Sequence, residues 1–308
     1  MPPVSAGGGS GDARRRRAAG EAPGNVAVTV RLPYRPPLDW LALLAFLAPR
    51  ATPGVEVVAG GVYRRTIAVG HARGTIAVRP GRASHLVLRV SLDRRTSLAP
   101  VVARARRLFD LDTDPADIAG HLSRSRVLAP LVARRPGLRV PGAWDGFELA
   151  VRAVLGQQVT VRGATTLAGR LVRAFGTAVA DDDGLTHLFP PPATLVDADV
   201  ASIGLPRTRA ATIRALATAV AQGVLPLDMS SGLDDAVARL TAVPGIGPWT
   251  AHYIAMRALA ERDAFPAGDL GLRRALGGGG TAPRAWAPWR AYAAVHLWTS
   301  LSEKEGTA

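Results

Sequence analysis

The sequence predicts an α+β fold: a small N-terminal antiparallel β-sheet domain with helices, followed by a mostly α-helical, two-lobed body that contains a helix–hairpin–helix. In residues 25–97, apolar residues alternate at period two between Gly or Pro-Gly breaks, which is the pattern of half-buried strands. In residues 98–302 they recur at helical spacing instead. The chain has 308 residues, a length that suits about two domains.

The N-terminal domain follows a tail of different composition. Residues 1–24 are rich in Gly, Pro and Ala and contain four consecutive arginines, Arg14 to Arg17, so we predict a disordered basic tail. These arginines either add weak, salt-sensitive affinity for DNA or are simply solvated. In the domain itself we expect a small sheet with one helix on its face. The expected strands and helix are Asn25–Leu32, Leu38–Ala48, Val55–Val69, Gly74–Arg79 and Leu86–Leu92.

The body is expected to be helical. Asp145 and Glu148 have the spacing of a capping box, in which each side chain binds the main-chain N–H of the other residue. Asp181–Gly184 predicts a surface turn, and Gly277–Gly280 predicts a flexible connection. The expected helices before the central motif are Leu98–Phe109, Pro115–Leu122, Asp145–Leu155, Thr160–Phe175, Thr194–Ile203, Pro206–Gln222 and Leu233–Thr241. A last helix, from about Pro288 to Ser302, precedes a short tail at 303–308.

The centre of the body is a predicted helix–hairpin–helix at residues 241–260. Its turn is Val243–Gly247, and its second helix begins at Pro248, where the missing N–H does no harm. Gly245 and Gly247 allow a partner to approach the backbone closely, and successive N–H groups point outward at the positive end of the new helix. A hairpin of this kind can hold a phosphate through main-chain amides without reading base sequence.

An acidic residue follows the hairpin at a short distance along the chain. Residues 261–276 form a loop in which Asp269 begins a further helix. An Asp at such a position is usually a helix N-cap. After a phosphate-binding hairpin, however, a carboxylate at a short distance along the chain is also a candidate functional residue.

Two aromatic residues share a face of the second hairpin helix, because Trp249 and Tyr253 lie at positions i and i+4. They belong either to an aromatic stripe of the core or to the wall of a pocket.

Several stretches together resemble one known family. VPGIGPWTAHYIAMRA followed by FPAGDLGLRR is similar to the helix–hairpin–helix and Gly/Pro-Asp signature of the base-excision DNA glycosylase superfamily, in particular its DNA-3-methyladenine glycosylase II (AlkA-like) branch. The other matching stretches, in the same order, are RLPYRPPLDWLALLAFLAPRA, YRRTIAVG, RLFDLD, RPGLRVPGAWDGFELAVRAVLGQQV and AYAAVHLW. The resemblance covers roughly residues 26–302 and implies a DNA repair enzyme with a mostly structural N-terminal domain.

The resemblance also implies roles for individual residues. Asp269 would be the catalytic carboxylate, acting on the sugar cation or on the attacking water, and Trp249, Tyr253 and Trp298 would line the pocket for the flipped base. Gln158 falls where the family inserts an apolar wedge into the minor groove, so it is either that wedge or a polar residue at a loop edge. The implied main-chain contacts are Gly245, Gly247, Trp249 and Thr250 to DNA, and the carbonyls of Thr241, Val243 and Ile246 to a Na⁺ or K⁺ ion.

The position of Trp249 predicts a monofunctional enzyme. Relatives that also cut the DNA strand carry a Lys two residues after the second hairpin Gly, where it acts as a Schiff-base nucleophile. Here that residue is Trp249, and the only lysine of the chain is Lys304. We therefore predict a glycosylase without AP-lyase activity that flips out alkylated purines of the 3-methyladenine type and leaves an abasic site.

Composition sets independent bounds. The formal net charge of +14 favours a polyanionic partner, although the nearly exclusive use of Arg can also reflect coding bias. The absence of cysteine excludes disulfides, a cysteine-ligated iron–sulfur cluster, a Cys zinc site and a thiolate alkyl acceptor. The six histidines show no metal-ligand spacing. The longest apolar run, Leu41 to Ala48, is too short to cross a membrane, so we expect a cytoplasmic, nucleoid-associated protein of bacterial type.

We expect a monomer that acts on double-stranded DNA containing alkylated bases, without a cofactor other than the alkali ion and without a membrane partner. Two alternatives stay open. One is a non-catalytic DNA-binding protein that uses the hairpin only for phosphates, and the other is a glycosylase for another lesion class, such as oxidised or deaminated bases. The combination of Asp269 with Trp249, Tyr253 and Trp298 favours catalysis over simple binding.

Overall fold

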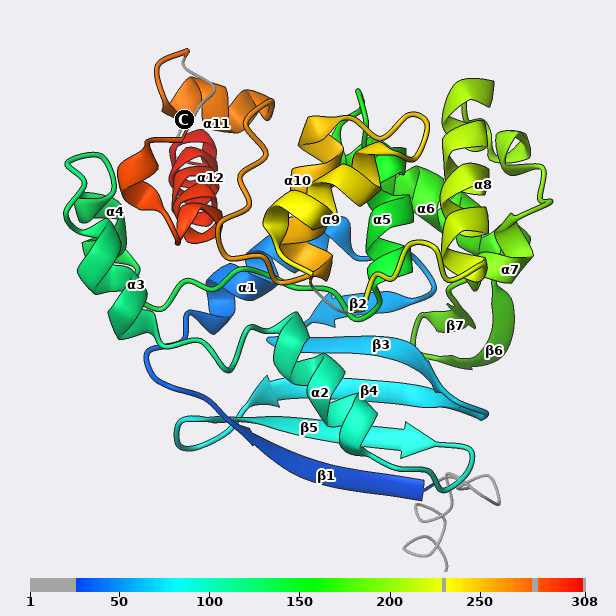
Figure 1. The fold of residues 1–308 in the computed structure, drawn as a ribbon. Coiled ribbons are helices and arrows are strands. Elements are labelled where there is room, and N and C mark those ends of the chain that lie inside the picture. The colour runs from blue at the N-terminus through cyan, green and yellow to red at the C-terminus, as the bar shows by residue number, and fades with distance from the viewer. Residues whose placement is uncertain (1–25, 229–230, 279–281, 307–308) are drawn as a thin grey trace, which may run out of the picture.

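A computed structural model describes residues 26–228, 231–278 and 282–306 and has the predicted α+β architecture (Figure 1). A β-sheet from the N-terminal part forms one layer, and most helices of the body gather above it in the view of Figure 1. The predicted tail 1–24, with Arg14 to Arg17, lies outside the described residues. The same holds for Gly279 and Gly280 of the predicted flexible connection.

The sheet has five strands in the order β1-β5-β4-β3-β2, each antiparallel to its neighbours. The segment Val55–Val69, expected as one strand, is mostly a hairpin of β2 and β3. Gly60 and Gly61 have φ values of 57° and 76°, as a tight two-residue turn requires. The strand bounds are β1 Val26–Pro33, β2 Glu56–Ala59, β3 Val62–Val69, β4 Ala72–Pro80 and β5 His85–Leu92.

Two helices pack on the sheet in one apolar core. These are α1 (Trp40–Leu47) and α2 (Ala99–Leu108), and α2 lies across the sheet in Figure 1. The ring of Phe109 lies 5.0 Å from that of Trp40 and 5.5 Å from that of Tyr63, between centroids. Because α2 belongs to this core, the N-terminal part that packs together continues past residue 97. At that residue the spacing of apolar residues changes from strand-like to helical.

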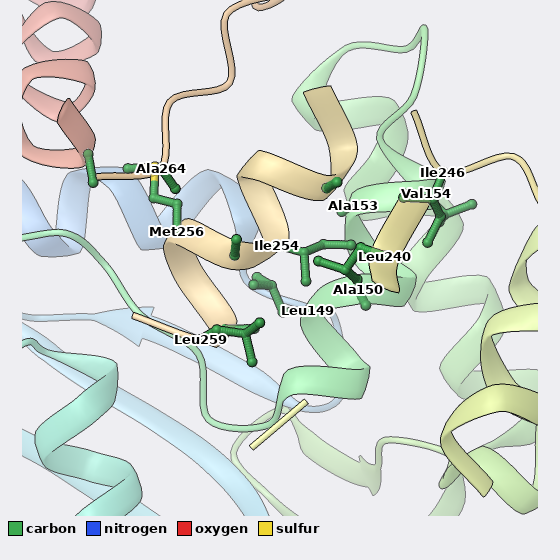
Figure 2. Packing of buried hydrophobic residues seen from close by; sticks show 14 of the residues in the cluster. Leu149, Ala150, Ala153, Val154, Leu240, Ile246, Ile254, Met256, Leu259 and Ala264 are labelled. Atoms are coloured by element: carbon green, nitrogen blue, oxygen red, sulfur yellow. The ribbon is translucent and has the colours of Figure 1, made fainter. Parts of the chain in front are cut away.

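The body is formed around α5 (Gly146–Leu155), which contacts α6, α8 and α10. Figure 2 shows Leu149 and Ala150 of α5 in one cluster with Leu240 of α9 and Ile254 of α10. None of the helices within the described ranges is long and apolar enough to cross a lipid bilayer. The other helices are α3 Pro115–Leu122, α4 Ala129–Arg134, α6 Val161–Phe175, α7 Pro192–Leu195, α8 Arg207–Ala221, α9 Leu233–Thr241, α10 Pro248–Ala258, α11 Leu270–Ala275 and α12 Arg290–Gly306.

Parts of the body differ from the expectation. Of the predicted turn Asp181–Gly184, only Asp183 and Gly184 form a turn, and they join two short strands, β6 (Thr177–Asp182) and β7 (Leu185–Leu188), so the body is not purely helical. The expected helix Thr194–Ile203 is divided into α7 and a 3₁₀ turn at Val200–Ile203, because the Asp-rich stretch between them favours turns over helix. Helix α4 was not predicted, since six residues are too few to establish a periodicity.

The β6–β7 hairpin ties the body to the sheet. The Thr66 hydroxyl of β3 donates a hydrogen bond to the His187 carbonyl at 2.7 Å. The N–H groups of Thr186 and His187 both donate to the Gly54 carbonyl, at 2.8 and 3.0 Å. The two parts of the chain are therefore joined by main-chain contacts as well as by side-chain packing.

A buried ion pair adds a second connection between the two parts. Asp145 caps α5 as expected, because its Oδ1 accepts from the N–H of Glu148 at 3.0 Å. The reciprocal half of the capping box is absent, and Glu148 instead binds Arg65 of β3, with Oε2 and Nη2 2.6 Å apart. Burial raises the pKa of Glu148 to about 7, although the charge of Arg65 opposes that change. The ion pair between Glu148 and Arg65 of the sheet thus takes the place of the expected hydrogen bond within α5.

Candidate active site

The helix–hairpin–helix is formed by α9, a turn and α10, at the predicted place. Gly245 has a φ of 87°, and a Cβ there would lie 2.0 Å from the Thr212 hydroxyl of α8, so the turn requires glycine. Gly247 faces open space, with no atom within 4 Å of the place of a Cβ apart from its chain neighbours. The first N–H groups of α10, which include those of Trp249 and Thr250, have no partner within the helix.

The loop between α5 and α6 is bound to the hairpin by one side chain. Gln157 Nε2 donates to the carbonyl of Gly245 and to the hydroxyl of Thr250, both at 3.0 Å. Arg209 of α8 donates to the carbonyl of Gln157 at 3.1 Å. The Thr250 side chain is therefore engaged within the protein, while its main-chain N–H lies in the first turn of α10 and has no partner within the helix. Gln158, the candidate wedge, is exposed at the next position and has a φ of 56°.

Asp269 is a helix cap and also a cavity residue. Its Oδ1 accepts hydrogen bonds from the N–H of Leu272, at 3.0 Å, and from the indole N–H of Trp298, at 2.9 Å. Its Oδ2 has no hydrogen-bond or ion-pair partner among the residues that the structure describes. The N-cap and the catalytic interpretations of Asp269 are thus compatible, because Oδ1 caps α11 and Oδ2 is available to a ligand.

The predicted aromatic residues come together beside this carboxylate. The rings of Trp249 and Tyr253 stack with 5.6 Å between centroids and an interplanar angle of 14°. Trp298, from α12, meets Tyr253 edge-on at 6.4 Å. Phe46, from α1, adds a fourth ring 6.3 Å from that of Trp298. All four side chains are only partly buried, so they have ring surface to offer to a ligand.

These side chains line a cavity of about 740 Å³. Its size is in the range of small-molecule sites, which is about 300–1,000 Å³. The walls come from α1, α5, the start of α6, α10, α11 and α12, so both parts of the chain contribute. The predicted site residues in the wall are Asp269, Trp249, Tyr253 and Trp298. The other predicted DNA contacts lie on the adjoining hairpin and loop: Gly245, Gly247, Thr250 and Gln158.

The same cavity is lined by arginines that the sequence analysis did not single out. Two of the five, Arg65 and Arg135, form ion pairs with carboxylates. The other three are Arg50 after α1, Arg152 of α5 and Arg257 of α10. None of the three forms an ion pair with a carboxylate within the described ranges. Arg257 instead donates to the carbonyls of Pro141 and Gly142, at 2.7 and 3.0 Å. A charged residue inside an apolar helical run, as in IAMRALA, is the sequence signal that could have revealed Arg257.

The three arginines without an ion pair among the described residues act on Tyr253. Arg257 donates to the hydroxyl of Tyr253 at 2.7 Å. Burial by itself would raise the pKa of Tyr253, but the charges of Arg257, Arg50 and Arg152, together with the hydrogen bond from Arg257, outweigh burial and lower that pKa. Burial also lowers the pKa values of Arg50 and Arg152, yet guanidinium groups in proteins stay protonated. Positive charge therefore surrounds Tyr253, and negative charge is held at Asp269.

The carbonyls that the resemblance implies for an alkali ion lie at the end of α9 and in the hairpin turn. The carbonyl of Val243 accepts from the N–H of Ile246 at 3.1 Å, which occupies one of its two lone pairs. Thr241 and Ile246 would supply the other two oxygens of such a site. Neutral oxygen donors suit a hard cation. In the part of the chain that the structure describes, no group of three or more His, Cys, Asp or Glu side chains could hold a metal ion.

Fold and site together define a helix–hairpin–helix protein with an aromatic, carboxylate-bearing cleft beside its hairpin. Residues 29–145 match the AlkA N-terminal domain, and residues 151–281 match the HhH-GPD superfamily base excision DNA repair protein. The chain belongs to this superfamily and, within it, to the family of DNA-3-methyladenine glycosylase 2.

Individual relatives agree with this membership. The chain is 38% identical to DNA-3-methyladenine glycosylase 2 of Escherichia coli, over 87% of this chain and 95% of that protein. It is 42% identical to the probable bifunctional transcriptional activator/DNA repair enzyme AlkA of Mycobacterium tuberculosis, over 89% of this chain but 57% of that protein. It thus spans little more than half of the mycobacterial relative. The solved 3-methyladenine DNA-glycosylase from Archaeoglobus fulgidus shares the fold, with a TM-score of 0.74 at 22% identity over 88% of this chain and 97% of that one.

Proposed function

We propose that this protein is a monofunctional DNA glycosylase of base excision repair. It binds double-stranded DNA, takes an alkylated purine of the 3-methyladenine type into the aromatic cavity and hydrolyses the N-glycosidic bond. The observation that carries the proposal is Asp269: one oxygen is fixed by two hydrogen bonds, and the other is available in a cavity with stackable rings. The relative in Escherichia coli, named for 3-methyladenine, supports the lesion class.

The carboxylate of Asp269 acts on the charge that the reaction creates. The bond between C1′ of the deoxyribose and the base nitrogen breaks, its electron pair leaves with the base, and the oxygen of water bonds to C1′. At about 4 Å and an effective dielectric constant near 20, opposite unit charges attract by about 4 kcal/mol. That stabilisation is worth roughly a thousandfold in rate. The same carboxylate can orient or deprotonate the attacking water.

The aromatic wall supports base extrusion. Taking a base out of the duplex costs a few kcal/mol, and stacking on an aromatic side chain returns about 1–3 kcal/mol per base. Trp249, Tyr253, Trp298 and Phe46 supply such surfaces. Stacking recognises planarity more than a pattern of hydrogen bonds, so we expect several damaged purines to be accepted.

The hairpin would bind the DNA strand beside the lesion. The proposed contacts are the main-chain N–H groups of Gly245, Gly247, Trp249 and Thr250, at the positive end of α10. A Na⁺ or K⁺ ion on the turn carbonyls would add positive charge near the phosphates. Gln158 is proposed to fill the gap left by the extruded base, because it is exposed on a loop that Gln157 fastens to the hairpin.

Strand cleavage is not part of the proposed reaction. Trp249 occupies the position of the Schiff-base lysine, and no lysine is among the described residues of the cavity wall. We further propose that the protein acts as a monomer and needs no zinc or iron–sulfur cluster.

Base release from defined DNA tests the proposal. The pure protein is incubated with duplexes bearing 3-methyladenine, 7-methylguanine, hypoxanthine or ethenoadenine, and free bases are quantified by chromatography. We expect free alkylated purines and strands that break only after alkali treatment. Binding without base release would favour the non-catalytic alternative. Strand breaks before alkali treatment would contradict the monofunctional assignment.

A further inference from the structure

The N-terminal sheet has an inner face, toward the core and the cavity, and an outer face turned away from both. Leu88 and Val90 of β5 are buried on the inner face, in one core with α1 and α2. Arg65 of β3 also points inward and lines the cavity. Because successive side chains of a strand alternate between the two faces, Arg89 of β5 and Arg64 of β3 belong to the outer face.

One end of the outer face is covered by the β6–β7 hairpin. The hydroxyl of Thr66 donates to the carbonyl of His187 at 2.7 Å. Arg64 is held by two carboxylates of the same hairpin, at 3.9 Å from Asp182 and 3.2 Å from Asp183. At the end of the sheet formed by β2 and β3, the chain thus neutralises its own surface arginine.

The other end of the outer face is formed by β4, β5 and β1, the strands farther from the helical body in Figure 1. It carries one exposed arginine from each strand, namely Arg79, Arg89 and Arg31, which we call the sheet arginines. Arg31 and Arg79 lie on either side of Val87 in the strand register, and Arg89 lies two residues farther along β5. With strands about 4.8 Å apart and a rise of about 3.4 Å per residue, the three Cα atoms are about 8–10 Å from one another.

The charge of the sheet arginines is not offset by carboxylates nearby in the sheet. Strands β1, β4 and β5 contain no Asp or Glu. None of the sheet arginines forms an ion pair within the described ranges, and Arg79 donates to the carbonyl of Pro80 at 3.4 Å. Asp93, which follows β5, is engaged by Arg94 and by the main-chain N–H of Arg73. The guanidinium donors of this face are therefore available to an external anion.

We propose that the sheet arginines form a second DNA-binding surface, which holds a duplex by its phosphates, separate from the duplex at the hairpin. Duplex DNA fits by charge complementarity, because it carries one negative charge per about 1.7 Å of its axis. Guanidinium groups match phosphate oxygens in geometry as well as in charge. Contacts to phosphates carry no sequence information, so this surface binds undamaged DNA as well as damaged DNA.

The two surfaces would hold two separate duplexes. The inner face of the sheet contributes to the cavity wall, and the sheet arginines lie on the opposite face. A duplex of about 20 base pairs is much shorter than the persistence length of about 150 base pairs, so it does not bend around from one face to the other. The inference goes beyond base excision and rests on the proposed function only for the first duplex, at the hairpin.

Sedimentation velocity of the full chain with an excess of an undamaged duplex of about 20 base pairs counts the duplexes bound per protein molecule. At about 50 mM salt we expect one protein molecule to carry two duplexes. Each phosphate contact adds about 0.9 to the slope of log affinity against log salt, so three contacts should weaken the second binding step about 40-fold between about 50 and 200 mM salt.

The triple variant Arg31→Gln, Arg79→Gln and Arg89→Gln should bind one duplex instead of two. Its affinity for the first duplex and its single-turnover release of 7-methylguanine should be unchanged, because the sheet arginines are not in the cavity wall. Replacing the same three residues by Lys should retain both duplexes, since Lys binds phosphate as a point charge.

A matched control removes the same amount of charge from other exposed positions, by Arg124→Gln, Arg126→Gln and Arg284→Gln, and should still bind two duplexes. Two duplexes on the triple sheet variant would overturn the inference, because the second one would then be held elsewhere or by a second protein molecule. Loss of the second duplex when residues 14–17 are replaced by Gln, with the sheet variant unaffected, would assign the binding to the tail and also overturn it.

A single substitution keeps the inference testable if the triple variant does not fold by circular dichroism. Arg89→Gln alone should lower the salt slope of the second binding step by about 1, and an unchanged slope would contradict the inference. An unaltered protein that binds only one duplex would overturn the inference and leave the proposed function intact. Failure to bind any duplex would instead overturn the proposed function.

Discussion

Replacing Asp269 by Asn isolates the charge of the carboxylate from its role in the structure. The amide oxygen of Asn can keep both hydrogen bonds of Oδ1, from Leu272 at 3.0 Å and from Trp298 at 2.9 Å. The amide nitrogen then takes the place of Oδ2, which has no partner in the described residues. The variant therefore loses the negative charge beside the sugar but keeps the N-cap of α11. An Asn is as good an N-cap as an Asp, so we expect the free energy of unfolding to change by less than about 1 kcal/mol.

The expected loss in rate follows from the Coulomb attraction. About 4 kcal/mol at about 4 Å and an effective dielectric constant near 20 corresponds to roughly a thousandfold slower base release. Single-turnover release of 7-methylguanine measures that rate, and fluorescence anisotropy with a labelled duplex measures binding, which should be retained. Asp114→Asn is the matched control: Asp114 caps α3 by the same kind of hydrogen bond but is not in the cavity wall. If Asp269→Asn kept more than a tenth of the rate, the carboxylate would not be the catalytic group.

Three further changes test other parts of the structure. Gln157→Leu removes two hydrogen bonds between the loop and the hairpin, each worth about 1 kcal/mol. Single-turnover base release should therefore fall about tenfold, while the DNA affinity measured by anisotropy is kept. The control Gln222→Leu, at an exposed position, should change neither the release rate nor the affinity. Burial lowers the pKa of His296 to about 4, below its value in the unfolded chain. The contribution of His296 to the free energy of unfolding should therefore be complete above about pH 6.5 and decrease by about 2 kcal/mol between pH 7 and pH 5, as measured by urea unfolding. His296→Gln should remove this part of the pH dependence. Arg65→Met leaves Glu148 buried without its cation and should lower the free energy of unfolding by about 3–5 kcal/mol, also measured in urea; no loss would mean that the pair is replaceable.

The elements that the sequence predicted well are those whose signal is local. Helices α3 and α9 have the expected bounds because their apolar spacing and flanking residues are sufficient by themselves. The β6–β7 hairpin was missed because it is stabilised by contacts to Gly54 and Thr66, which are far away in the sequence. Glu148 illustrates the same limit, since a side chain expected to bind its own helix is taken by Arg65 of the sheet.

The sequence predicted those features of the candidate site that depend only on residue type and helical spacing. Trp249 and Tyr253 had to share a face, and Asp269 had to begin a helix, whatever the tertiary structure. The position of Trp298 could be proposed only from family resemblance, because its contact with Asp269 joins two separate helices. Phe46 and Arg50 were overlooked, since nothing in an N-terminal helix indicates that it will close a cavity formed mainly by the helical body.

Trp298 links the two tasks of the site. Its indole N–H fixes Oδ1 of Asp269, and its ring forms part of the wall against Tyr253 and Phe46. A substitution at Trp298 would therefore disturb the orientation of the carboxylate and the stacking surface together. Phe46 reaches the cavity from α1 and Arg50 from the 3₁₀ turn that follows α1, and both lie outside the helix that Asp269 caps. Substitutions in α1 can thus alter the contacts to the base while the carboxylate stays in place, and we expect lesion preference to be set there more than at Trp298.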